Sequence, residues 1–184
     1  SDYRRRRWRN RRLDVDAGKL TKIRSTATKE PDRGYLSVPG MVEFPTTAGK
    51  SAYGFYYPPQ NQDFSGPEGE LPPLIVQSHG GPTSSTSTAL RSQIQYWTSR
   101  GFAVLDVDYG GSTNYGREYR ERLNDNWGIV DIDDCMNGAK HLIAEGMVDP
   151  DRVVIQGWSA SGYTTLSALA FRDFFKAGIS YFGI

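Results

Sequence analysis

The sequence predicts an α/β fold with a mostly parallel sheet and helices on both faces of the sheet. Two observations support this class. Short, continuous apolar runs recur along the chain, and segments with helical periodicity separate them. Apolar runs without polar alternation are typical of parallel strands, because crossover helices cover both faces of a parallel sheet. A length of 184 residues fits one domain with a short additional segment.

The first 34 residues are predicted to lie outside this fold. Seven of the first twelve residues are arginine, which we interpret as a solvated chain end; a basic arm for nucleic acid or an anionic membrane is the alternative. Residues 13–15 and 20–23 are short alternating runs around a turn that contains Gly18, and they predict a hairpin. Residues 24–34 are polar and contain Pro31 and Gly34, which predicts a linker.

From Tyr35 onward the pattern predicts strands that alternate with helices. We expect two antiparallel strands first, then a proline- and glycine-rich surface loop at 58–73, then buried parallel strands. The strands are predicted at residues 42–44, 51–57, 74–76, 102–107, 153–155 and 177–182. The helices are predicted at 90–100, 115–123, 129–144 and 160–171, the third of them from apolar side chains at three- and four-residue spacing.

Composition argues against several classes of protein. With 22 basic and 21 acidic residues the net charge is +1, which disfavours a globally basic nucleic-acid binder. No apolar run approaches the ~20 residues of a membrane span, so neither nucleic acid nor a membrane is expected as a partner. The single cysteine, Cys135, excludes an internal disulfide framework and favours a reducing, cytoplasmic compartment. Its place on the apolar face of the helix at 129–144 predicts a buried, inert thiol.

No metal or cofactor motif is visible. Asp131, Asp133 and Asp134 stand at the start of the helix at 129–144, where we expect them to favour the helix dipole and to face solvent rather than bind a cation. The pair Gly110-Gly111 lacks the following lysine and hydroxyl residue of a phosphate-binding loop. His141, beside Lys140, is off the apolar stripe and is expected on the surface.

The strongest chemical signal is the run from Val153 to Gly162. An apolar strand leads into a tight turn with Ser159 at its tip, and a helix of small residues follows, which is the setting of a nucleophile elbow. The helix start would direct N–H groups at a developing oxyanion. The match to G-x-S-x-G is imperfect, because Ser161 stands at the fifth position and the glycine follows at Gly162. An ordinary strand–helix junction with a serine cap is the alternative.

A second signal is His79-Gly80-Gly81-Pro82, which directly follows a predicted buried strand. α/β-Hydrolases take one oxyanion N–H from the corresponding loop, where glycines let the backbone approach the substrate. An ordinary Gly-Pro turn is the alternative. The order of this run and the predicted elbow along the chain suggests that both belong to one active site.

Four longer runs share a common pattern: residues 72–83, 101–117, 127–131 and 149–152. Together they resemble the prolyl oligopeptidase family, in its dipeptidyl-peptidase and acylaminoacyl-peptidase branch. The resemblance covers about Tyr35 to Ile184. It implies an α/β-hydrolase fold, truncated here before its last strands. Residues 1–34 would then be a remnant of a preceding β-propeller with its linker, and residues 35–184 the N-terminal part of the catalytic domain.

The resemblance implies a serine peptidase that hydrolyses short peptides near their N-terminus and needs no cofactor. Ser159 would be the acylated nucleophile. The N–H of Ala160 and the Gly80–Gly81 segment, with Gly81 preferred, would form the oxyanion hole. His79 fills a place where some branches carry a tyrosine that donates to the oxyanion, so a backbone donor is implied here.

The remaining triad members are not visible in the sequence. In α/β-hydrolases an acid and then a histidine follow the serine, but Asp173 is the only acid after Ser159, and no histidine follows it. We therefore expect a fragment that is inactive alone, within a longer protein that binds peptides and can form a homo-oligomer. An esterase of the same fold and a catalytically dead binding domain are the alternatives.

Overall fold

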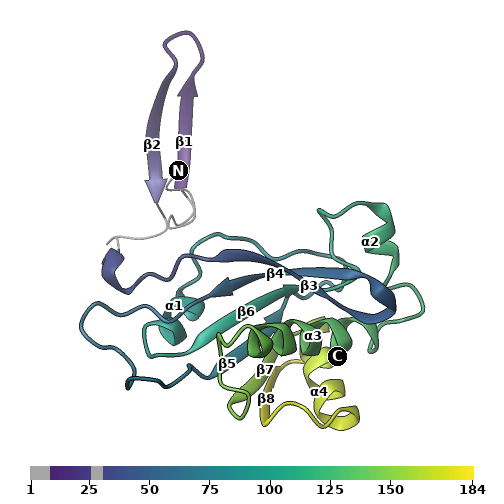
Figure 1. Ribbon diagram of the computed structural model, residues 1–184. Coiled ribbons are helices and arrows are strands. Elements are labelled where there is room, and N and C mark those ends of the chain that lie inside the picture. The colour runs from purple at the N-terminus through teal and green to yellow at the C-terminus, as the bar shows by residue number, and fades with distance from the viewer. Residues whose placement is uncertain (1–8, 26–30) are drawn as a thin grey trace.

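The chain forms a six-stranded sheet and a separate two-stranded hairpin in a computed structural model that describes residues 9–25 and 31–184 (Figure 1). The order in the large sheet is β3-β4-β6-β5-β7-β8. Its strands are β3 (Gly40–Pro45), β4 (Ser51–Tyr57), β5 (Leu74–Ser78), β6 (Ala103–Asp108), β7 (Val153–Trp158) and β8 (Ala177–Tyr181). The pairs β3–β4 and β4–β6 are antiparallel, and the pairs among β5, β6, β7 and β8 are parallel. The predicted α/β class and the antiparallel first strands are confirmed.

Helices cover both faces of the sheet, as predicted. On one face, Ile94 of α1 (Ser92–Thr98) packs against Ile75 and Val104. On the other face, α3 (Val130–Ala144) and α4 (Ala160–Phe171) cover the larger core, in which Leu105 lies. The short helix α2 (Arg117–Glu121) lies in the segment after β6. All residues of the central strands β5 and β6 are buried, which explains their continuous apolar runs.

The strands β5 and β7 extend two and three residues beyond their predicted ends. Pairing between β5 and β7 continues through Gln77 and Gln156, and β7 reaches Trp158. Both glutamines are buried, and their side-chain amides form a hydrogen bond of 3.0 Å with each other. The apolar pattern marked only the first part of these strands, because the backbone ladder continues through polar residues, whose burial the pattern does not register.

The helix α3 confirms one prediction and corrects another. Its stripe Ile132, Cys135, Ala139 and Leu142 is fully buried, and the Cys135 thiol is free. The prediction that the acidic residues at its start face solvent is wrong for two of them, because Asp131 and Asp134 are buried.

The two buried carboxylates hold neighbouring segments against the start of α3. Asp131 accepts the N–H of Gly128 at 2.7 Å and the hydroxyl of Thr164. Asp134 accepts the N–H of Gly110 at 2.7 Å and the hydroxyl of Thr46. Burial raises the pKa of both carboxyl groups, and the hydrogen bonds oppose that shift. Their role is therefore to bind loops and helices together.

His141 is also less exposed than predicted. Its ring is half-buried and stacks on Phe44, with centroids 6.4 Å apart. His141 is therefore partly exposed rather than fully solvated, because β3 passes close to this side of α3 and supplies the aromatic partner.

The N-terminal hairpin is confirmed. Strands β1 (Arg9–Asp14) and β2 (Lys19–Ser25) pair antiparallel, and all residues from Asn10 to Arg24 are exposed. The arginines before residue 9 and residues 26–30 of the predicted linker lie outside the described residues. In the described part of the chain, none of the helices combines the length and the apolar character needed to cross a membrane.

Candidate active site

Ser159 is the single residue between the end of β7 and the start of α4. Its backbone angles are φ 55° and ψ −122°, a conformation that non-glycine residues rarely adopt. The adjoining elements fix it: its N–H donates to the carbonyl of Tyr181 at 3.1 Å, and its carbonyl accepts from Tyr163 at 3.1 Å. The half-buried side chain thus stands on a sharp turn that the strand and the helix over-determine.

Two glycines let the strand and the helix meet at this turn. A Cβ on Gly157 would lie 2.1 Å from the carbonyl oxygen of Ser161. A Cβ on Gly162 would lie 2.8 Å from the Cα of Gly183 and 2.9 Å from the hydroxyl oxygen of Ser180. Both positions therefore exclude any side chain, which explains why glycines are needed around the predicted elbow.

The two serines of the turn differ in environment. Ser161 is 1% exposed, and its hydroxyl oxygen lies 2.8 Å from the N–H nitrogen and 2.9 Å from the carbonyl oxygen of Trp158. Its hydroxyl proton is used in that second contact. Ser159 is the more accessible of the two, and it alone occupies the tip of the turn.

The loop after β5 passes directly beside the turn. The strands β5 and β7 are parallel neighbours, so their carboxyl ends meet at one edge of the sheet. A Cβ on Gly80 would lie 3.2 Å from the carbonyl oxygen of Trp158 and 3.7 Å from the Cβ of Ser159. Gly81 has a φ of 132°, which also requires glycine. The structure thus brings together the two runs that the sequence analysis assigned to one site.

The ring of His79 holds this loop. Its Nδ1 lies 2.9 Å from the carbonyl oxygen of Gly80, and its Nε2 lies 2.6 Å from the hydroxyl oxygen of Ser112. Burial lowers the pKa of His79, opposed by its bond to Gly80 and by Asp108, so the neutral ring is favoured. A carbonyl only accepts, so Nδ1 carries the proton, and Nε2 accepts from the Ser112 hydroxyl.

The contact between His79 and the Gly80 carbonyl also orients the N–H of Gly81. The carbonyl of Gly80 and the N–H of Gly81 belong to one planar peptide unit and point in opposite directions when that unit is trans. Since His79 holds the carbonyl, it also sets the direction of the Gly81 N–H. At the other side of the turn, the N–H of Ala160, the first residue of α4, has no acceptor within the helix. The N–H of Ala160 thus directly follows Ser159 in the turn, and the loop that carries the Gly81 N–H passes beside Ser159.

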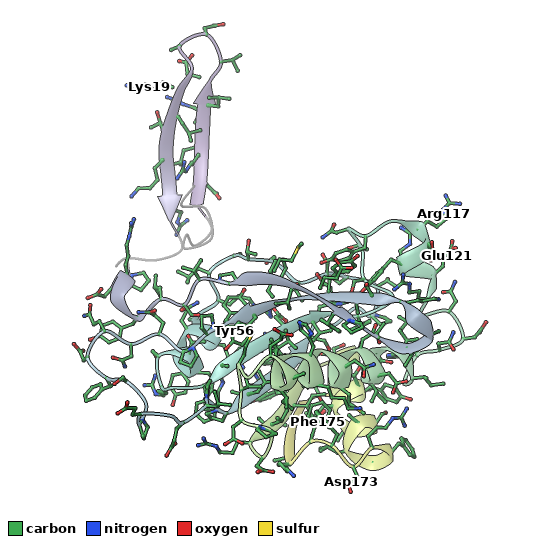
Figure 2. The ribbon with its side chains drawn as sticks, in the orientation of Figure 1. Lys19, Tyr56, Arg117, Glu121, Asp173 and Phe175 are labelled. Atoms are coloured by element: carbon green, nitrogen blue, oxygen red, sulfur yellow. The ribbon has the colours of Figure 1, made fainter. Side chains whose placement is uncertain are left out.

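Neither His79 nor Asp173 is placed to act with Ser159 as a base or acid. Both ring nitrogens of His79 are already bonded, one to Gly80 and the other to Ser112. Asp173 is exposed and follows the far end of α4, a helix of twelve residues, from Ser159 (Figure 2). Twelve residues of helix span about 18 Å.

Sequence reasoning did not identify the support of the His79 loop. Asp108 lies 3.9 Å from the His79 ring and accepts the N–H of Thr86 at 2.7 Å and the hydroxyl of Tyr115 at 2.9 Å. The Tyr109 ring stacks on His79 with centroids 4.5 Å apart. The one available signal was that polar residues directly follow the neighbouring buried strands β5 and β6, where carboxyl ends converge.

The described residues do not include the ligand set that a metal site needs. Within residues 9–25 and 31–184, no group of three or more His, Cys, Asp or Glu side chains is placed to hold a metal ion. The buried carboxylates Asp131 and Asp134 instead accept hydrogen bonds from backbone and hydroxyl groups. What the described site offers is a strained serine between the first turn of α4 and the Gly80 loop.

Comparison with known proteins shows the family of the chain. Residues 88–184 match the prolyl oligopeptidase family. The chain is 32% identical over 176 residues to dipeptidyl aminopeptidase BIII of Pseudoxanthomonas mexicana, covering 94% of the chain and 25% of that protein. Among solved structures it is similar to a Mycobacterium tuberculosis puromycin-hydrolyzing peptidase, with 45% identity, a TM-score of 0.92, and coverage of 95% of the chain and 26% of that structure.

A more distant similarity points the same way. The Pyrococcus horikoshii acylaminoacyl peptidase is 32% identical with a TM-score of 0.72, over 80% of the chain and 23% of that structure. These neighbours are α/β-hydrolase peptidases, which confirms the predicted fold class. The chain spans about a quarter of the length of each of these three proteins.

Proposed function

Because the chain belongs to the prolyl oligopeptidase family of serine peptidases, we propose that it carries the nucleophile and the oxyanion hole of such an enzyme. Ser159 is the nucleophile, and the N–H groups of Ala160 and Gly81 are the oxyanion donors. The observation that carries the proposal is the backbone of Ser159, with φ 55° and ψ −122°, beside the Gly80 loop. A strained serine held by its surroundings is typical of catalytic positions.

The proposed reaction is acyl transfer. The Oγ of Ser159 attacks the carbonyl carbon of a peptide bond and loses its proton to a general base. The carbonyl oxygen becomes an oxyanion held by the two backbone donors, which typically contribute 10²–10³-fold each to such a rate. The C–N bond then breaks, and the amine leaves with a proton. Water cleaves the resulting ester and regenerates the serine.

The general base and its acid partner are proposed to follow residue 184 in a longer protein. This agrees with the chain order serine, acid, histidine of α/β-hydrolases. Coverage of about a quarter of the matched proteins supports the idea of a longer protein. In the same proposal, residues 1–34 end a preceding β-propeller and residues 35–184 begin the catalytic domain. The exposed hairpin β1–β2 is consistent with strands that pair elsewhere.

The proposed substrates are short peptides cut near a free or acylated N-terminus. The similar proteins include a dipeptidyl aminopeptidase, an acylamino-acid-releasing enzyme of Arabidopsis thaliana and a puromycin hydrolase. A mutant of a puromycin hydrolase was solved in complex with PGG. We also propose a cytoplasmic location, on the ground of the single, free cysteine.

A substrate panel tests this function in the natural-length protein. Aminoacyl, dipeptidyl and N-acetyl-aminoacyl chromogenic amides are compared with the corresponding esters. We expect amide hydrolysis that Ser159→Ala abolishes and that Ser167→Ala preserves, since Ser167 is a buried serine on the same helix. Hydrolysis of esters alone would favour an esterase. Absence of hydrolysis for every substrate would favour a binding domain.

A further inference from the structure

Ser161 stands where the G-x-S-x-G pattern has glycine, and its side chain makes contacts that glycine cannot make. It is the second residue of α4 and is 1% exposed. The N–H of Trp158 donates to the Ser161 hydroxyl oxygen at 2.8 Å, and that hydroxyl donates to the carbonyl of Trp158 at 2.9 Å. One side chain therefore satisfies both backbone groups of the residue before Ser159.

The sheet explains why Trp158 needs this partner. In a strand, alternate residues direct their N–H and C=O groups to the same neighbour, so Trp158 faces the side of β5, as Gln156 does. The β5–β7 pairing ends at Gln77 and Gln156, and β5 itself ends at Ser78. Trp158 consequently lies beyond the last ladder bond on that side.

The other edge of the turn is held by the sheet. Trp158 pairs with Tyr181 of β8, and the N–H of Ser159 donates to the carbonyl of Tyr181 at 3.1 Å. On the β5 side the backbone of Gly80 lies close to this residue, since a Cβ built on Gly80 would be 3.2 Å from the Trp158 carbonyl oxygen. Without the Ser161 hydroxyl, the β5 side of the elbow would lose both of the bonds made to Trp158.

We propose that Ser161 is a positioning residue whose hydroxyl replaces the absent strand partner of Trp158 and thereby holds the backbone of Ser159 in its strained conformation. The inference rests on the proposed function of Ser159. A strained conformation persists only where its surroundings over-determine it, and Ser161 supplies this restraint on the side that β5 leaves open. Ser161 itself touches no substrate, since it is buried and its hydroxyl proton is bonded.

Hydrogen exchange of the Trp158 amide tests the restraint without reference to catalysis. In the natural-length protein, deuterium uptake is read at single-residue resolution by mass spectrometry. We expect Ser161→Ala to lower protection of this amide at least tenfold and Ser161→Thr, which keeps the hydroxyl, to retain it. Ser167→Ala is the matched control, a buried serine six residues further along α4. Unchanged protection in Ser161→Ala would overturn the inference.

The second readout is the rate at which a fluorophosphonate probe modifies Ser159. We expect Ser161→Ala and Ser161→Gly to react ten to a hundredfold more slowly at saturating probe, with the concentration for half-saturation unchanged, and Ser161→Thr to recover most of the rate. Should Ser161→Ala fail to fold, Ser161→Cys, with a weaker donor and acceptor, replaces it in both measurements and should give intermediate values. A wild-type rate in these variants would refute the positioning role.

The two readouts separate the inference from the function on which it rests. If the wild-type protein is not labelled at Ser159, the proposed function fails, and the exchange of the Trp158 amide still decides whether Ser161 restrains the turn. If the wild type is labelled and Ser161→Ala neither slows labelling nor exposes the amide, the function stands and the inference fails.

Discussion

Gly157→Ala tests the close approach of strand and helix at the elbow. The added Cβ would lie 2.1 Å from the carbonyl oxygen and 2.3 Å from the carbonyl carbon of Ser161, where ordinary contact begins at 3.4 Å. The backbone of α4 would have to move by roughly 1 Å, and a helix backbone cannot rotate aside as a side chain can. Overpacking usually costs about 1–3 kcal/mol, so we expect at least the upper end of that range.

Urea unfolding followed by tryptophan fluorescence measures this loss, and Gly40→Ala is its control. Gly40 lies in β3, where an added Cβ meets nothing within 4 Å, so its change should stay below about 1 kcal/mol. Gly157→Ala should also abolish labelling of Ser159 in the fraction that remains folded. Equal unfolding midpoints for the two variants would refute the argument that the glycine is required by contact.

Three further predictions concern buried polar groups. Burial lowers the pKa of His79 in the folded state, so the unfolded chain takes up the proton at a higher pH, and stability should fall as the pH drops below about 6.5. His79→Gln should reduce the pH dependence of the urea midpoint between pH 7.5 and 5, and an unaltered pH dependence would contradict a buried neutral ring. The Cys135 thiol is fully buried with a raised pKa, so a thiol-specific disulfide reagent should react only after urea is added, and immediate reaction would show an open core. Asp131→Ala leaves the Gly128 N–H without its acceptor and removes one of the two acceptors of the Thr164 hydroxyl, which keeps the Ala160 carbonyl at 3.2 Å. It should cost about 2–3 kcal/mol, whereas exposed Asp173→Ala should change stability by less than about 0.5 kcal/mol; similar urea midpoints would argue against the buried contacts.

Those features that depend on local periodicity could be predicted from the sequence. The bounds of α4 and β4 agree with the expected 160–171 and 51–57. Gly157 and Ser159 could be located because a nucleophile elbow needs a strand, a tight turn and a helix of small residues in immediate succession. These requirements concern residues that are consecutive in the sequence, and they do not depend on the rest of the fold.

Contacts between distant segments could not be predicted in this way. Asp131 and Thr164 are 33 positions apart, as are His79 and Ser112. An aspartate near a helix start is equally compatible with solvent or with a buried acceptor role, and only the packing of α3 against α4 decides between them. In the sequence, Ser161 is only a departure from the motif. Its hydroxyl has a partner in Trp158 because the β5–β7 pairing ends before Trp158, and tertiary structure sets where that pairing ends.

The site of covalent modification by a fluorophosphonate tests the central claim most directly. The natural-length protein is treated with the probe, digested and sequenced by mass spectrometry. The account predicts one adduct, on the Oγ of Ser159, that disappears in Ser159→Ala and persists in Ser167→Ala. An adduct on Ser161, or labelling that survives Ser159→Ala, would contradict the assignment of the nucleophile.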